Sequence, residues 1–232
     1  MASTLPLNDR LLRSWLRCKR RAWLDRHADP AQRQWTAHRE LQLDEQRRAF
    51  SILCPQRPAH GEAAAASGAP ALVGLRLRGV GPRQPAGHTL ALEGHPPLLQ
   101  RVEGHSRWGG HAYRPVLFRQ GRNTTREHRL VLALWGRLLA EHQASELRSG
   151  LVLAWAGRGL AQEALPLAGG LQRQLEEALL KLADDLARPE PPPLVADRKK
   201  CVLCGWRSAC DQVAAAEGHL SAVSYTHLTL PT

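Results

Sequence analysis

The stretch Tyr113–Leu139, YRPVLFRQGRNTTREHRLVLALWGRLL, contains the two elements on which the fold depends. Its first residues, Tyr113–Phe118, form a short apolar run typical of a strand, and a polar loop with a glycine follows. Thr124 then has the position of a helix cap, with Glu127 closing a capping box. Apolar residues recur at helical spacing through the remainder: Val131, Leu134, Trp135, Leu138 and Leu139. The segment therefore predicts a strand followed by an amphipathic helix.

Similar signals lie on both sides of this segment. Short apolar runs separated by Gly and Pro clusters precede it and predict hairpins or a meander: 71–77, 89–92 and 98–102. After it, Leu151–Trp155 predicts another strand, and Leu171–Leu186 predicts a second amphipathic helix that ends before the prolines starting at Pro189. Strands followed by a helix, a strand and a helix indicate an α/β fold with a mixed sheet covered by helices.

The N-terminal region is helical and strongly basic. Asn8 is a predicted cap, and the apolar stripe behind it consists of Leu11, Leu12, Trp15, Leu16 and Trp23. Basic residues surround that stripe: Arg10, Arg13, Arg17, Lys19, Arg20, Arg21 and Arg26. A polar helix is expected over 31–50, and the Ala, Gly, Ser and Pro residues of 55–70 predict a loop. Because the charges are nearly all positive, this face is expected to meet phosphate.

The net charge of the chain indicates which class of partner to expect. The 232 residues contain 32 Lys and Arg against 21 Asp and Glu, a formal charge of +11. A polyanion, above all nucleic acid, is the expected partner. No apolar run is long enough to span a membrane, and the N-terminus lacks the pattern of a secretion signal. The sequence therefore predicts a cytoplasmic protein without a membrane partner.

The cysteines carry the most specific signal. Three of the five lie in CVLCGWRSAC, as Cys201, Cys204 and Cys210. This C-x2-C-x5-C spacing suits a metal centre, which needs a fourth ligand. Cys18 is the best candidate, because its basic neighbours stabilise the thiolate that metals bind. Cys54 precedes a proline in a loop and is interpreted as a small buried apolar residue.

Three interpretations of these cysteines remain open. A structural zinc site fits four thiolates equally well on chemistry alone. The lopsided spacing, with one cysteine far upstream and three near the end, favours an iron–sulfur cluster. Free thiols are the third interpretation, and disulfides are disfavoured in an intracellular protein.

This pattern resembles a known family. A cysteine in the first helix, a sheet domain and a terminal C-x2-C-x5-C resemble the RecB-like and CRISPR-adaptation nucleases of the PD-(D/E)XK superfamily. Residues 17–30 (RCKRRAWLDRHADP) and 113–139 are similar to a cyanobacterial group of RecB-like nucleases, and the resemblance covers residues 5 to 220. It implies a restriction-endonuclease-like mixed sheet flanked by helices, a 4Fe-4S cluster on the four cysteines, and metal-dependent DNA cleavage in repair or recombination.

The catalytic motif of that superfamily is missing from this chain. The family holds magnesium or manganese with an acidic residue on each of two strands, and a lysine orients the water. The matching positions here carry Pro97, Leu117 and Arg119, and those of the family's Gln-x3-Tyr carry Val131 and Trp135. Glu93 and Glu103, the acidic residues nearby, each precede a glycine and are interpreted as turn residues. No catalytic residue is therefore assigned.

These observations predict a DNA-binding, catalytically degenerate member of the family. Basic residues flanking the former active site are the expected nucleic-acid contacts: Arg119, Arg122, Arg126, Arg198, Lys199 and Lys200. One alternative is an active exonuclease, which alone would need magnesium or manganese. Another is a non-catalytic scaffold subunit of a DNA-processing protein complex.

The chain divides into four predicted parts. Residues 1–53 form the basic helical region that contributes one cluster cysteine, and 54–188 form the nuclease-like core. Residues 189–222 form a proline-rich linker with the cysteine segment. Residues 223–232 (VSYTHLTLPT) resemble the translation of a sequencing adapter, so no part of the fold is predicted from them.

Overall fold

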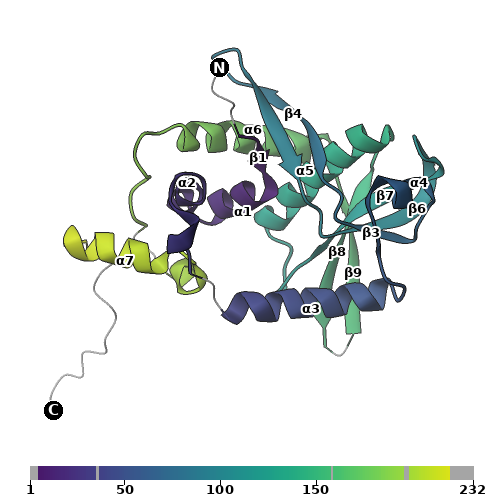
Figure 1. Ribbon diagram of the computed structural model, residues 1–232, viewed down its shortest axis with the longest axis horizontal. Coiled ribbons are helices and arrows are strands. Elements are labelled where there is room, and N and C mark those ends of the chain that lie inside the picture. The colour runs from purple at the N-terminus through teal and green to yellow at the C-terminus, as the bar shows by residue number, and fades with distance from the viewer. Residues whose placement is uncertain (1–4, 35–36, 158, 196–198, 220–232) are drawn as a thin grey trace.

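A mixed six-stranded sheet forms one side of the molecule (Figure 1). The computed structural model describes residues 5–34, 37–157, 159–195 and 199–219. The strands of this sheet, in spatial order, are β2 (Ala59–His60), β3 (Ala71–Val73), β6 (Leu98–Ser106), β7 (Gly109–Phe118), β8 (Ser149–Ala156) and β9 (Gly159–Pro166). β6 and β7 are antiparallel, whereas β7 and β8 run parallel with Leu117 beside Val152. The sheet is therefore mixed, as predicted.

A second, smaller sheet contains the strands β1 (Leu7–Asn8), β5 (Thr89–Gly94) and β4 (Leu77–Arg83). β4 and β5 form the predicted hairpin, and β1 runs parallel to β5. The sequence predicted a single sheet, so this division is a correction. Its physical cause lies between β5 and β6, where Pro96 and Pro97 have no N–H to continue a ladder and the chain moves from one sheet to the other.

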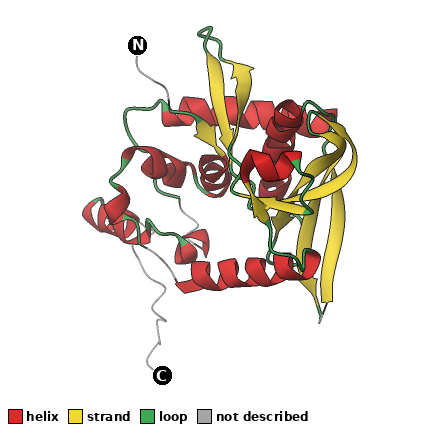
Figure 2. Ribbon diagram, turned by 45° about the vertical axis from the view of Figure 1, so that its right-hand side comes forward, coloured by secondary structure: helices red, strands yellow, loops and turns green. Residues whose placement is uncertain are grey.

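Helices cover both faces of the larger sheet (Figures 1 and 2). The long ones are α3 (Ala37–Leu53), α5 (Arg126–Gln143) and α6 (Gly169–Leu186); the shorter ones are α1 (Asp9–Arg17), α2 (Lys19–His27), α4 (Gly61–Ala66), α7 (Arg207–Ala216) and the 3-10 turns η1 (Pro30–Gln32) and η2 (Lys199–Leu203). Neighbouring residues of β7 face opposite sides. Leu117 belongs to the main core with α5 and α6, and Val116 belongs to a smaller core with Ala49 of α3.

The central helix α5 is buried more completely than its sequence predicts. Besides the predicted stripe, Leu132 and Ala133 are also fully inaccessible. The reason is that α5 packs against strands of both sheets and against α1 and α6. Its N-cap is Thr125, with His128 completing the capping box, one position later than the predicted Thr124 and Glu127. This shift frees Glu127 for contacts with α1.

Several boundaries differ from the predictions. The expected loop at 55–70 contains β2 and α4, and the polar helix expected from residue 31 begins as α3 at Ala37. Asp29 caps η1 by accepting a hydrogen bond from the Ala31 N–H at 2.9 Å. The predicted strand at 151–155 and helix at 171–186 are confirmed. Across the described ranges, no helix is long and apolar enough to cross a membrane.

The N-terminal helices belong to the same hydrophobic core as the sheet domain. Leu12 of α1, Leu132 of α5 and Leu182 of α6 are all fully buried in it. Arg198 and the adapter-like segment 223–232 lie outside the described residues. The domain boundaries drawn from the sequence stay predictions.

Candidate functional site

Four cysteines from opposite ends of the chain line one cavity of about 240 Å³. Cys18 is the single extended residue between α1 and α2, and Cys201 lies in η2. Cys204 follows η2, with its N–H donating to the Cys201 carbonyl at 3.0 Å, and Cys210 lies in the first turns of α7. These are the four residues that the sequence singles out as ligands. Cys54 lies apart from them, half-buried in a different cavity, so it is less buried than predicted.

Arginine side chains complete the wall of this cysteine cavity, among them Arg17, Arg20 and Arg21. The Nε of Arg20 is buried and has no hydrogen-bond partner in the described residues. Burial raises the pKa of the Cys210 thiol, while Arg20 opposes that shift through its charge and a hydrogen bond. A buried donor beside thiols is suited to stabilise negative charge in the cavity.

The cysteine segment is attached to the N-terminal helices by contacts other than the cysteines. Trp206 is almost fully buried and donates its indole N–H to Asp25 at 2.9 Å. The Gln34 N–H donates to the Gly205 carbonyl, also at 2.9 Å. A Cβ on Gly205 would lie 2.7 Å from the Gln34 carbonyl oxygen, so only glycine fits there. The fold therefore holds the segment against α1 and α2 through its own side chains and backbone.

Four thiols are a donor set that either a zinc ion or an iron–sulfur cluster accepts. Four thiolates around a single zinc would lie about 3.8 Å apart, given Zn–S bonds of about 2.3 Å. Within the described residues, no three Cys, His, Asp or Glu side chains gather closely enough for a single ion. The four thiols surround a cavity instead, and positive side chains offset the negative charge of an all-thiolate cluster. The donor set is compatible with an iron–sulfur cluster.

The positions of the family's catalytic motif carry no oxygen ligand. Leu117 is buried in the main core, Pro97 lies at the bend before β6, and Arg119 follows β7. Glu93 and Glu103 lie within β5 and β6, not in turns as predicted. The turn prediction failed because both glutamates are paired in ladders: Gly94 ends β5 opposite Leu77, and Gly104 lies at an irregularity of the β6–β7 ladder, not in a turn.

Neither glutamate is arranged as a metal ligand beside Leu117. Glu93 is buried in the smaller sheet, where Arg76 at 2.8 Å, Arg78 at 3.4 Å and His95 at 3.3 Å surround its carboxylate. The hydrogen bond from Arg76 is the main cause of its lowered pKa. Glu103 is exposed on β6. His111 is buried in β7, and its Nε2 hydrogen-bonds the Ala65 carbonyl at 2.9 Å.

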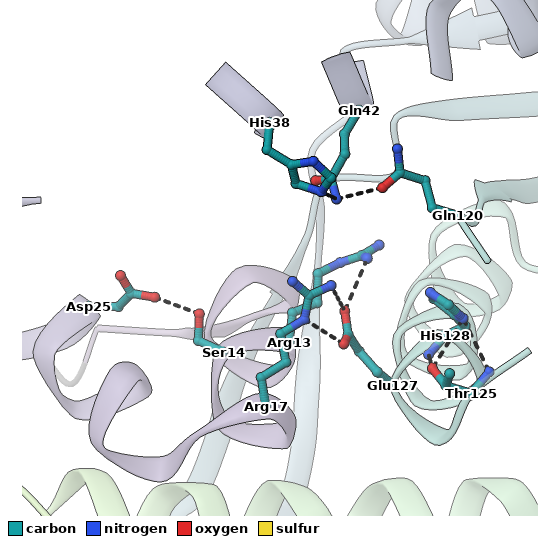
Figure 3. Close-up of polar contacts among 10 residues, drawn as sticks. All are labelled: Arg13, Ser14, Arg17, Asp25, His38, Gln42, Gln120, Thr125, Glu127 and His128. Atoms are coloured by element: carbon teal, nitrogen blue, oxygen red, sulfur yellow. Dashed lines mark hydrogen bonds and ion pairs between the residues drawn. The ribbon is translucent and has the colours of Figure 1, made fainter. Parts of the chain in front are cut away.

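An ion cluster that the sequence did not reveal lies where α1 meets the start of α5 (Figure 3). Arg17 donates two hydrogen bonds to the Glu127 carboxylate, at 2.6 and 2.8 Å, and Arg13 lies 3.7 Å from it. Burial opposes ionisation of Glu127, but these arginines outweigh it and lower the pKa. Burial lowers the pKa of His128 to about 4, so its ring is neutral at pH 7. The regular spacing of arginines in α1 is the sequence feature that could have indicated this cluster.

The residues predicted to contact nucleic acid differ in their exposure and surroundings. Arg119 is half-buried, its guanidinium donates to the Gly121 carbonyl, and its buried Nε has no partner in the described ranges. Arg122 and Arg126 are exposed on the β7–α5 loop and the start of α5. Lys199 and Lys200 begin η2, but their side chains, like all of Arg198, lie outside the described residues. Arg119 lies near Arg13 and Arg17 of α1, because all three charges act on His128.

The basic residues predicted to form one face of the first helices lie in three different environments. Lys19 pairs with Asp185 at 2.9 Å, and Arg26 donates to the backbone carbonyls of Leu5 and Pro6. Arg20 turns toward the cysteines and donates to the Pro192 carbonyl. Arg10, Arg13, Arg17 and Arg21 lie near Arg39, whose pKa is lowered first by burial and then by their positive charges.

Comparison with known proteins gives a structural likeness only. No protein-family model matches the chain, and no curated protein matches it. Among solved structures, the crystal structure of SSO0001 has the same fold with a TM-score of 0.50 and 12% sequence identity, over 90% of this chain and 87% of that one. At this identity the likeness concerns the fold alone.

Proposed function

We propose that this chain binds DNA through its arginine-rich side, on a restriction-endonuclease-like fold whose nuclease motif is degenerate, and that it acts in DNA repair or recombination. The observation that carries the proposal is the convergence of arginines from α1, α2, α3 and the β7–α5 loop. Arg10, Arg17, Arg21, Arg33 and Arg39 line one cavity, and the charges of Arg13, Arg17 and Arg119 all act on His128. So many like charges held together favour a polyanionic partner.

Because the nuclease motif is degenerate, the proposal includes DNA binding but not DNA cleavage. Magnesium needs oxygen ligands, and the matching positions are Pro97, Leu117 and Arg119. Arg119 retains a positive charge that can contact a phosphate but cannot hold a cation or activate water. Binding without cleavage is the function these residues support best.

The cysteine cavity supplies the second part of the proposal. Cys18, Cys201, Cys204 and Cys210 would hold a 4Fe-4S cluster, with zinc as the alternative ion. Such a centre, when bound, links its thiolates covalently and so joins the C-terminal segment to the first helices. Arg20 would donate to the negative charge of the centre, and Trp206 and Asp25 position the segment around it.

A salt titration of DNA binding tests the proposal. Fluorescence anisotropy is measured with single- and double-stranded oligonucleotides in EDTA. With four phosphate contacts, we expect affinity to fall about a hundredfold between 50 and 200 mM salt, with little sequence preference. The variant Arg122→Gln/Arg126→Gln should reduce the salt slope by about 1 to 2. The control Arg83→Gln/Arg173→Gln changes the same charge on the β4–β5 hairpin and α6.

Two results would contradict the proposal. One is the absence of binding at low salt. The other is binding without steep salt dependence, which favours the alternative of a scaffold subunit in a DNA-processing complex. Equal effects of the two double variants would show that net charge, not this surface, governs the affinity.

A further inference from the structure

A second cavity, of about 300 Å³, is lined by more arginines than the cysteine cavity. It lies between α1, α2, the η1 turn, the start of α3 and the Leu203–Gly205 stretch that crosses it. The charged and titratable side chains around it are Arg10, Arg17, Arg21, Arg33, Arg39 and His38. None of the described residues lining it is acidic. We call it the arginine pocket.

Two carboxylates lie behind these arginines rather than in the pocket. Asp25, whose side chain is fully inaccessible, lies 3.6 Å from Arg10 and 3.5 Å from Arg33. Glu127 accepts hydrogen bonds from the Nε and Nη2 of Arg17. These ion pairs fix the orientation of the guanidinium groups and leave the pocket itself positive, an arrangement suited to an incoming anion.

Arg21 lines both this pocket and the cysteine cavity. The Nε of Arg21 is buried and makes no hydrogen bond to any described residue. A buried polar atom without a partner is costly, and an anion bound beside the Arg21 guanidinium would offset that cost through its charge. Across the pocket, His38 is fixed by Gln42 at 2.8 Å, and Gln42 donates in turn to Gln120 at 2.6 Å (Figure 3). This hydrogen-bonded chain connects the pocket to the loop after β7, where Arg119 lies.

The size and charge of the pocket indicate the kind of anion. Its volume is at the lower end of the roughly 300–1,000 Å³ of small-ligand sites, which suits one nucleotide and not a duplex. A terminal phosphate carries close to two negative charges at pH 7 and exposes three oxygens, whereas a phosphodiester inside a strand carries one charge. Several arginine forks converging on one small pocket match the terminal group better.

We infer that the arginine pocket binds the terminal phosphate of a single DNA strand, and so recognises strand ends. This inference rests on the proposed DNA binding and deepens it. The surface around Arg119, Arg122 and Arg126 would hold the adjoining backbone, while the pocket would hold the end.

Three oligonucleotides of one sequence test the inference: one with hydroxyl ends, one with a 5′-phosphate and one with a 3′-phosphate. Affinities are measured in EDTA at fixed salt. One phosphorylated end should bind about tenfold tighter than the hydroxyl ends, as expected for a few charge-assisted hydrogen bonds. Arg21→Gln should abolish that preference, measured as the ratio of the affinities for the phosphorylated and the hydroxyl-ended strand, so that any general loss of DNA affinity cancels.

Two further variants make the test independent of folding defects and net charge. Arg10→Gln should also reduce the preference; Arg10 lines this pocket and not the cysteine cavity, and its side chain is 56% exposed. Arg173→Gln, on the exposed side of α6, should leave the preference intact. Melting temperatures and absorbance spectra establish that each variant is folded and retains any bound centre.

The possible failures are distinguishable. Equal affinity for all three oligonucleotides would overturn the inference and leave DNA binding in place. A preference that survives in both Arg21→Gln and Arg10→Gln would place the end site elsewhere and would also overturn it. Absence of binding to every oligonucleotide would overturn the proposed function, and the inference with it.

Discussion

The indole N–H of Trp206 donates to the carboxylate of Asp25 over 2.9 Å, and this hydrogen bond joins residues 181 positions apart. Asp25 also accepts a hydrogen bond from Ser14 at 2.5 Å, so α1, α2 and the cysteine segment meet at one carboxylate. Trp206 lies within the CVLCGWRSAC stretch, between Cys204 and Cys210. The cysteine segment is therefore positioned by a tryptophan as well as by its thiols.

The first prediction concerns this hydrogen bond. Trp206→Phe keeps most of the apolar volume but removes the donor, so we expect unfolding free energy to fall by about 1–2 kcal/mol. Trp23→Phe is the matched control, because its indole N–H donates to the Arg188 carbonyl at a more exposed site and its loss should cost less than about 0.5 kcal/mol. Urea denaturation measures both. If Trp206→Phe and Asp25→Ala had strictly additive effects, the coupling would be disproved.

The second prediction concerns the cysteines. Cys204→Ser and Cys18→Ser should each lower the melting temperature and remove a broad absorbance band near ~400 nm from anaerobically purified protein. Cys54→Ser is the control, since Cys54 lies in another cavity and should change neither property.

Alternative outcomes of the cysteine experiment are informative. A featureless spectrum with one bound zinc per chain, lost in both variants, would replace the cluster with a zinc site. An unchanged spectrum together with unchanged thermal stability would show that these thiols hold no metal.

The third prediction is a dependence of stability on pH. The pKa of His128 is lowered by burial to about 4 in the folded protein, against 6.5 for the free side chain. The unfolded chain therefore binds a proton that the folded chain does not, and stability falls as pH drops from about 6.5 toward about 4. Allowing for partial exposure, we expect His128 to account for about 1–2 kcal/mol of this loss.

His128→Gln isolates that contribution. Glutamine at this helix position can still complete a capping box with Thr125 but does not titrate. The wild-type protein should lose more stability than the variant between pH 7 and pH 4.5, measured by urea denaturation. Parallel pH profiles for the two proteins would contradict the assignment.

The fourth prediction is that the protein does not cut DNA. Neither single- nor double-stranded DNA should be cleaved with magnesium or manganese present, because the motif positions lack oxygen ligands and arginines engage Glu93. Cleavage that co-purifies with the chain and disappears in Glu93→Gln or Glu103→Gln would establish the active-nuclease alternative. Cleavage unaffected by either change would come from a contaminating nuclease.

Some features follow from the sequence because they depend on nearby residues. The helices α5 and α6 appear in the spacing of their leucines, since a helix that buries one face must repeat apolar residues every three or four positions. The four cysteines that line one cavity were likewise identified by spacing and by the basic neighbours of Cys18. Metal-ligand types at short spacing are a local signal.

Other features were decided by tertiary structure alone. β9 has polar residues on both faces and pairs along its whole length with β8, so the partner strand rather than its own composition makes it a strand. The bidentate contact between Arg17 and Glu127 joins residues 110 positions apart. Arg20 and Arg21 are adjacent in sequence and both line the cysteine cavity, yet of the two only Arg21 also lines the arginine pocket. Sequence determined how many positive charges this region carries; only the packing of α1, α2 and α3 determined which of them face an anion, because Coulomb energies depend on distances in space.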